Sequence, residues 1–173
     1  MARLKDPFCS ISHWVGLGLA VIGVIVLIAL SIGKPLHLLA FGIYGLGLAT
    51  LYFASAFYHT IRASGKAERR LQKFDHSAIY LMIAGTYTPL LVLGVGGTLG
   101  WSLLALVWAM AACGIVFKWF FTGRFPLVST LAYVGMGWVA LLGGEPLLSA
   151  LPAATVFLIV AGGVAYTVGA MLF

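Results

Sequence analysis

The stretch HWVGLGLAVIGVIVLIALSI (residues 13–32) decides the fold, because no charged side chain interrupts it. Gly33, Lys34 and Pro35 then end the apolar run. A helix rises about 1.5 Å per residue, so this length crosses the roughly 30 Å of hydrocarbon in a bilayer. The run is too long for a buried strand and lacks the two-residue alternation of a half-buried one. The sequence therefore predicts a membrane-spanning helix.

Five further apolar stretches follow, each about 17–24 residues long and therefore able to span a membrane. They cover residues 36–59, 75–93, 100–121, 126–142 and 152–173. A strongly polar segment, residues 60–74, separates the second stretch from the third and is expected to be a connection. We therefore predict one all-α transmembrane domain over residues 1–173, with six spans in this chain.

The composition agrees with a chain that is mostly surrounded by lipid. Apolar residues make up 62% of the sequence and charged residues only 8%, whereas a soluble domain carries about 25% charged residues. This excludes a disordered chain, a coiled coil and an ordinary cytosolic enzyme. The two cysteines, Cys9 and Cys113, lie in different segments and give no disulfide framework.

The basic residues predict the orientation of the spans. If all six stretches cross the membrane, only Lys34 lies on one side. The other nine share the opposite side: Arg3, Lys5, Arg62, Lys66, Arg69, Arg70, Lys73, Lys118 and Arg124. Because positive residues accumulate on the cytoplasmic side, we expect a multi-pass protein of the cell membrane, here a bacterial inner membrane, with a cytoplasmic N-terminus. The same rule explains the positive net charge without nucleic-acid binding.

Several polar residues fall at the predicted cytoplasmic end of the spans. Ser55 and His59 are four positions apart and share one helix face, while Asp75 opens the third predicted span at the same depth. An imidazole with a nearby carboxylate can form part of a metal site. Alternatively, these are interfacial residues, with Asp75 as the N-cap of the third helix. His13 is interpreted as interfacial.

A proline predicts an irregularity near the end of the third span. Pro89 removes one intrahelical hydrogen bond, and Thr86 and Thr88 can bond to carbonyl groups of the preceding turn. We expect a kink at this point.

Three motifs resemble the hemolysin III family, which is related to the progestin and adipoQ receptors and, more distantly, to the alkaline ceramidases. Ser55 and His59 match the family's S-x-x-x-H motif. The block FDHSAIYLMIAGTYTP (residues 74–89) matches the family's next block almost residue by residue. The weaker first motif, E-x-x-N-x-x-x-H, has Asp6 in place of Glu and Cys9 in place of Asn, and ends at His13.

This resemblance implies a seven-helix fold with a cytoplasmic N-terminus and a zinc ion near the cytoplasmic side. It assigns His59 as a zinc ligand, Asp75 as the carboxylate that holds the zinc-bound water, and Ser55 as a hydroxyl close to the metal or the substrate. Two further histidine ligands belong to an H-x-x-x-H motif on the seventh helix. We therefore expect them beyond Phe173, in a segment that follows the sixth span.

The resemblance supports three hypotheses about function. The first is a zinc-dependent hydrolase that cleaves an amide or acyl bond of a membrane lipid, with Asp75 and Ser55 as catalytic residues. The second is a membrane-perturbing hemolysin or channel. The third is a sensor or receptor of the membrane state, in which zinc is structural and nothing is turned over. In each, membrane lipid is the expected partner.

Overall fold

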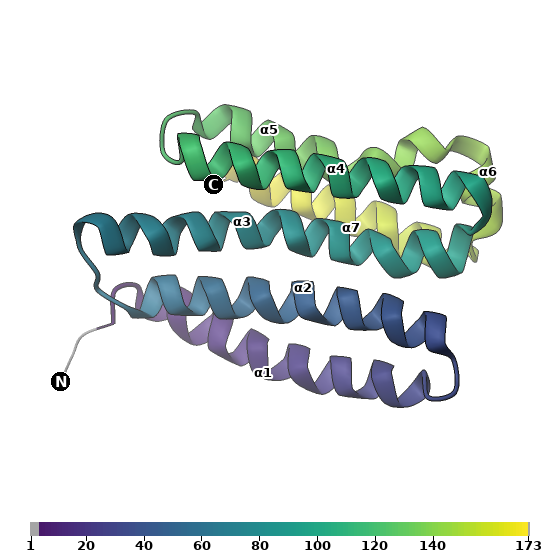
Figure 1. Cartoon of the computed structure of the whole chain (residues 1–173), viewed down its shortest axis with the longest axis horizontal. Helices are drawn as coiled ribbons and strands as arrows, with labels where there is room; N and C mark the ends of the chain where they lie inside the picture. Colours follow the sequence, from purple (N-terminus) through teal and green to yellow (C-terminus); the bar gives the residue numbers. More distant parts are fainter. Residues whose placement is uncertain (1–3, 173) are drawn as a thin grey trace.

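The computed structural model describes residues 4–172, which form helices joined by short connections (Figure 1). Arg3, from the charge count above, and Phe173, from the predicted sixth span, lie outside the described residues, as do the histidine ligands expected beyond Phe173. Six helical segments in the described part are long and apolar enough to cross a membrane. This confirms the predicted all-α membrane fold.

The first four segments are α1 (Pro7–Leu30), α2 (Pro35–Thr60), α3 (Gly65–Pro89) with the π-helical turn η1 (Leu90–Val95), and α4 (Gly97–Phe121). The fifth combines α5 (Pro126–Gly137), the 3₁₀ turn η2 (Val139–Gly143) and α6 (Gly144–Ala150). The sixth is α7 (Ala153–Leu172).

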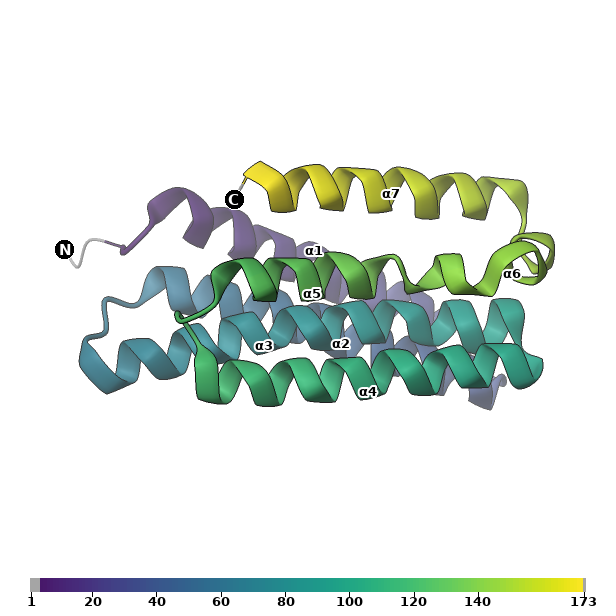
Figure 2. The ribbon, with the colours of Figure 1, turned by 90° about the horizontal axis from the view of Figure 1, so that it is seen from above.

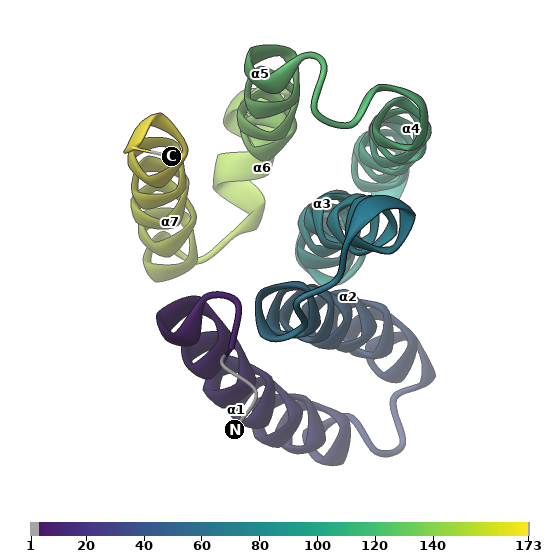
Figure 3. The same ribbon diagram turned by 90° about the vertical axis from the view of Figure 1, so that its left-hand side faces the viewer.

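The helices follow one another around an open ring, as the view along the bundle shows (Figure 3). Each of the helices α2, α3, α4 and α5 packs against the one before it, and α7 packs against α5. α1 begins and α7 ends at the same end of the bundle (Figure 2). We call this the basic end, because every described basic residue except Lys34 belongs to a helix end or connection located there.

The helices α2 and α3 touch through glycines, which brings their backbones close together. A Cβ atom added at Gly47 would lie 3.0 Å from the carbonyl oxygen of Leu81, and one added at Gly85 would lie 3.3 Å from that of Ile43. Small residues at such crossings allow the close packing that holds membrane helices together. The pair α2–α3 is thus a tightly packed support for side chains near its end.

The third helix begins much earlier than its apolar stretch. Residues 60–74 were predicted to be a connection, which is wrong: α3 begins at Gly65, and the connection from α2 covers only residues 61–64. The polar residues that follow Gly65 include Lys, Glu, Arg and Gln, which form helices well. Hydropathy marks where a helix enters the membrane, and here the helix continues beyond that point. Likewise, α1 begins at Pro7 rather than at His13.

The regular geometry of α3 ends at Pro89, where an irregularity was predicted. The chain continues as the π-helical turn η1, since Pro89 cannot donate the next helical hydrogen bond. The Thr88 hydroxyl donates to the Ala84 carbonyl at 2.9 Å and accepts a bond from the indole of Trp108 on α4 at 3.2 Å. Thr88 therefore also ties α3 to α4.

The fifth segment is not the continuous helix predicted for residues 126–142. Its α-helix ends at Gly137, and a 3₁₀ turn precedes α6. Tyr87 of α3 stabilises this break: its hydroxyl donates to the Gly137 carbonyl at 2.7 Å and accepts from the Ala140 amide at 3.0 Å. A side chain from another helix thus satisfies backbone groups that the break leaves free, as membrane proteins require.

Candidate functional site

Ser55, His59 and Asp75 lie together at the basic end, on the facing sides of α2 and α3. Ser55 and Asp75 are buried, with 6% and 9% of their surfaces exposed. The Ser55 hydroxyl interacts with the Asp75 carboxylate, and His59 and His13 are close enough to act on its charge. The fold therefore surrounds one buried carboxylate with a hydroxyl and two imidazoles.

Asp75 is not the N-cap of a helix, so that alternative interpretation was wrong. α3 begins at Gly65, ten positions earlier, and Ser64 occupies its N-cap position. In the interior of a helix, an Asp side chain satisfies no backbone donor of the first turn. The carboxylate of Asp75 instead points to neighbouring side chains, and its burial needs an explanation in terms of those groups.

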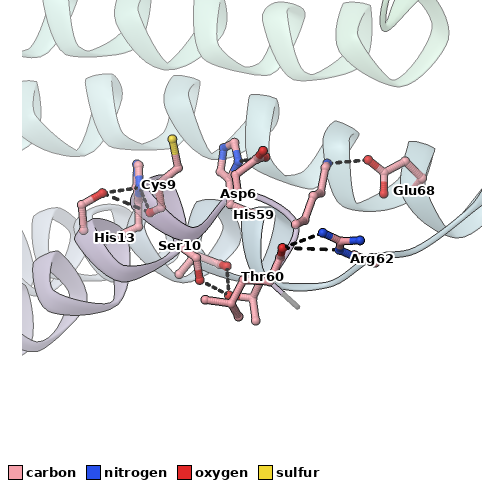
Figure 4. Close-up of polar contacts among 12 residues, drawn as sticks. Asp6, Cys9, Ser10, His13, His59, Thr60, Arg62 and Glu68 are labelled. Carbon is pink, nitrogen blue, oxygen red and sulfur yellow. Dashed lines mark hydrogen bonds and ion pairs between the residues drawn. The ribbon is translucent and has the colours of Figure 1, made fainter. Parts of the chain in front are cut away.

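Asp6 fixes the orientation of the His59 ring (Figure 4). The Nδ1 atom of His59 lies 2.8 Å from Oδ2 of Asp6, and the Asp6 amide donates to the His59 carbonyl at 3.0 Å. A carboxylate only accepts hydrogen bonds, so Nδ1 of His59 carries the proton. In the neutral ring, Nε2 is then free to bind a metal, which is the arrangement of a carboxylate–histidine–metal triad.

His13 lies beside His59 rather than apart from it. Nδ1 of His13 is 2.6 Å from the carbonyl oxygen of Cys9, which can only accept, so this nitrogen also donates. The two imidazole rings stack with centroids 5.9 Å apart and an interplanar angle of 24°. Both rings therefore use Nδ1 for an internal hydrogen bond and leave Nε2 available.

The segment before α1 is fastened to the connection between α2 and α3, and we call Leu4–Asp6 the strap. Lys5 pairs with Glu68 at 2.5 Å and lies over the Tyr58 ring, 3.5 Å from its centroid. Burial alone would lower the pKa of Lys5, but its interactions with Glu68 and Tyr58 raise that pKa. Arg62 donates two hydrogen bonds to the Leu4 carbonyl, at 3.3 and 3.1 Å (Figure 4).

The strap continues into α1 through a hydroxyl pair. The side chains of Ser10 and Thr60 are 2.6 Å apart, and the Trp14 indole donates to Thr60 at 3.0 Å. These contacts hold the first turns of α1 against the end of α2. They determine where Asp6 and His13 stand relative to His59.

The described residues supply only some of the ligands that a metal site needs. Within residues 4–172, no three His, Cys, Asp or Glu side chains are grouped as metal ligands. His59 offers one imidazole nitrogen, and the Asp75 carboxylate lies close by. Of the other two histidines, His76 follows Asp75 in α3, and His37 stands at the start of α2 at the other end of the bundle, beside Phe41. Both cysteines are free, and Cys113 is exposed on α4.

The comparison with known protein families gives a match along the whole chain. The sequence model of the family described as "Haemolysin-III related" matches residues 1–173. This chain belongs to the haemolysin III-related family. The family assignment confirms the resemblance drawn from the Ser55–His59 motif and the block at residues 74–89. It also supports a multi-pass membrane protein, as the six long apolar helices do.

Relatives of the haemolysin III-related chain come from bacteria and from animals. It is 43% identical over 166 residues to "Hemolysin-3" of Bacillus cereus. This alignment covers 95% of this chain and 75% of that protein. It is 40% identical over 176 residues to the "Hemolysin-3 homolog" of Bacillus subtilis (strain 168), covering all of this chain and 82% of that protein. The human "Monocyte to macrophage differentiation factor" is 29% identical over 100 residues, or 56% of this chain and 42% of that protein. No solved structure matches the chain.

Two features near the basic end were missed by the sequence analysis. The hydrogen bond between Asp6 and His59 joins residues that are far apart in the sequence, and no local pattern reports it. The second feature is a buried lysine on α4, Lys118, described below.

Proposed function

We propose that this protein is a zinc-dependent hydrolase that cleaves an amide or acyl bond of a membrane lipid. His59 would be a zinc ligand, Asp75 the catalytic base and Ser55 a hydroxyl that binds the substrate. The observation that carries the proposal is the buried, helix-interior Asp75 carboxylate beside Ser55 and an imidazole whose Nδ1 is held by Asp6. A packing role explains an apolar residue at such a position, but not a carboxylate.

The described residues can supply one zinc ligand, His59, and the carboxylate of Asp6 that supports it. Neutral imidazole is a common zinc ligand, and the bond to Asp6 leaves Nε2 of His59 free while raising its basicity. The family resemblance implies two further histidines to complete the donor set. When bound, zinc would act as a Lewis acid that polarises the scissile carbonyl.

The side chains of this chain would perform the proton and hydrogen-bond chemistry. Asp75, acting through a carboxylate oxygen, would orient the attacking water and take its proton. Ser55 would donate a hydrogen bond to the carbonyl oxygen of the substrate as negative charge develops there. The contact between Ser55 and Asp75 would keep both groups oriented before the substrate binds.

The depth of the site suits a lipid substrate. Asp75 lies where α3 enters the apolar part of the bundle, so the linkage between headgroup and acyl chains would reach it while the chains stay in the membrane. We further propose that the basic end is cytoplasmic, because every described basic residue except Lys34 belongs to it. The protein would then be embedded in the bacterial inner membrane.

A membrane-perturbing activity is the second candidate, and the printed name of two bacterial relatives, Hemolysin-3, favours it. A sensor or receptor with structural zinc is the third.

One experiment separates the three candidates. The purified protein is placed in liposomes, and mass spectrometry measures the release of acyl products while fluorescence measures the leakage of an entrapped dye. The hydrolase predicts zinc-dependent product release that a chelator abolishes, without leakage. Leakage without products would overturn it in favour of the hemolysin, and neither signal would favour the sensor.

A further inference from the structure

A second polar cluster lies where α3 meets α4 and α5, and it is formed by side chains that the proposed hydrolase does not use. Lys118 of α4 is its centre, and we call the group the Lys118 cluster. Its other members are three residues of α3 and one of α5: His76, Ser77, Tyr80 and Tyr133. Lys118 belongs to the last turn of α4, at the basic end of the bundle.

Lys118 is buried without an acidic partner. Only 4% of its surface is exposed, although a lysine is rarely buried unless it is paired. The four acidic residues of the sequence are otherwise placed. Asp6 pairs with His59, Glu68 pairs with Lys5, Asp75 faces α2, and Glu145 begins α6 at the other end of the bundle. No ion pair of the described residues involves Lys118.

Potential donors of α3 lie along the part of this helix that packs against the end of α4. Tyr80 is four positions from His76 and three from Ser77, so it lies next to each of them on the surface of α3. Tyr80 packs against Gly114, one turn before Lys118, so this face of α3 is turned toward α4. The charge of Lys118 acts on the His76 ring.

These donors are buried and have no hydrogen-bond partner among the described residues. This holds for Nδ1 of His76, the Ser77 hydroxyl and the Tyr80 hydroxyl. Tyr80 and Ser77 are only 1% and 6% exposed. Buried polar groups are usually paired, so three unpaired polar atoms on the stretch of α3 that packs against the helix of an unpaired lysine indicate a ligand rather than a packing motif.

Tyr133 closes the cluster from α5. Its ring centroid is 5.5 Å from Nζ of Lys118 and 4.5 Å from the centroid of Tyr80. Its hydroxyl donates to the His76 carbonyl at 2.9 Å. The aromatic rings therefore fix the position of the cation and of the hydroxyl of Tyr80 without neutralising the charge.

We propose that the Lys118 cluster binds a phosphate group, with the lysine ammonium and the hydroxyls of Ser77 and Tyr80 as donors. An ammonium group and several hydroxyl or ring N–H donors suit an anion with several acceptor oxygens. The depth suits the headgroup of an anionic lipid, because basic pockets between membrane helices bind such groups. Lys73 and Arg124 add positive charge nearby: Lys73 donates to the Trp119 carbonyl, and Arg124 follows the end of α4. The phosphate proposal requires neither zinc nor the proposed hydrolysis.

Native mass spectrometry of the purified full chain, titrated with phosphatidic acid, tests the proposal. Diacylglycerol with the same acyl chains is the lipid control, since it lacks only the phosphate. Lys118→Met should weaken phosphatidic acid binding by about 10-fold or more, because a charge-assisted contact is lost. Lys118→Arg should keep most of the affinity. The matched variant Lys34→Met, at the other end of the bundle, should bind like the wild type.

Inorganic phosphate distinguishes the source of the group. If it competes with phosphatidic acid at low millimolar concentration in the wild type but not in Lys118→Met, the cluster also accepts free phosphate. If it does not compete, the ligand is the lipid headgroup. Tyr80→Phe and Ser77→Ala each remove one hydroxyl and should each weaken binding several-fold, which tests the site even if Lys118→Met fails to fold. Equal binding of phosphatidic acid and diacylglycerol, or unchanged affinity in the folded variants, would overturn the proposal.

Discussion

The Asp6 carboxylate accepts a hydrogen bond from the His59 ring, with Oδ2 and Nδ1 2.8 Å apart, across a separation of 53 positions in the sequence. Asp6 belongs to the strap and His59 to the last turn of α2, so the pair joins the beginning of the chain to the candidate site. A carboxylate bonded to Nδ1 fixes the ring of a metal-binding histidine and strengthens its other nitrogen as a ligand. This relationship leads to the first prediction.

Replacing Asp6 with Ala should lower zinc affinity by roughly 10–100-fold, because losing such a supporting carboxylate typically has this effect. The measurement is a competition titration of the purified protein against a zinc chelator. Glu68→Ala is the matched control. It breaks the ion pair between Glu68 and Lys5 of the strap and leaves the contact between Asp6 and His59 in place. Equal losses in both variants would show that the strap only anchors the chain.

Replacing His59 with Ala should reduce the bound zinc of the purified protein by at least ~10-fold, because a direct ligand matters no less than its supporting group. His37→Ala is the control, as His37 lies at the other end of the bundle. Metal content by inductively coupled plasma mass spectrometry is the readout. Equal zinc in the wild type and in the His59 variant would rule out the metal centre and the hydrolase mechanism that depends on it.

Replacing Asp75 with Asn should leave most of the zinc in place and strongly reduce lipid hydrolysis. Asn can still hydrogen-bond a water molecule and Ser55, but it cannot take a proton. Ser55→Ala should be milder, since one neutral hydrogen bond contributes only about 0.5–1.5 kcal/mol. Zinc content and product release are measured on the same samples. Full hydrolysis by the Asp75→Asn variant would exclude Asp75 as the base.

A fourth prediction concerns the close contact of α2 with α3. Gly47→Leu should destabilise the protein by about 1–3 kcal/mol, because overpacking forces the two backbones apart. The control Gly42→Leu lies on the same helix, where an added Cβ meets nothing within 4 Å. Thermal unfolding in detergent compares the two. A similar loss in both variants would mean that helix propensity, rather than the contact, explains the effect.

The sequence was sufficient for the membrane fold because lipid imposes a strong length and polarity rule on each span. It also placed Ser55, His59 and Asp75 at one end, since helices of similar length that cross one bilayer align their ends. It did not predict that α3 begins at Gly65, because the charged first turns lie outside the membrane and hydropathy does not report them. The N-cap interpretation of Asp75 failed for that reason.

Other features depend on contacts between distant parts of the chain. The break of the fifth segment at Gly137 is stabilised by Tyr87 from α3, and no property of residues 126–142 alone indicates it. The hydrogen bond between Asp6 and His59 depends on how the strap folds back over α2. Lys118 was counted only as one of the basic residues that set the orientation, whereas the structure buries its side chain beside α3.

The last prediction tests the orientation from which the depth of the candidate site is argued. In a background with Cys9 and Cys113 replaced by Ser, Ser64→Cys places one exposed thiol in the connection between α2 and α3. Lys34→Cys places an exposed thiol in the connection at the other end of the bundle. If the basic end is cytoplasmic, a membrane-impermeant maleimide added to intact spheroplasts should label the Lys34 position. It should label the Ser64 position only after the membrane is permeabilised. Labelling of Ser64→Cys in intact spheroplasts, with Lys34→Cys protected, would reverse the topology and place Asp75 and His59 at the outer face instead.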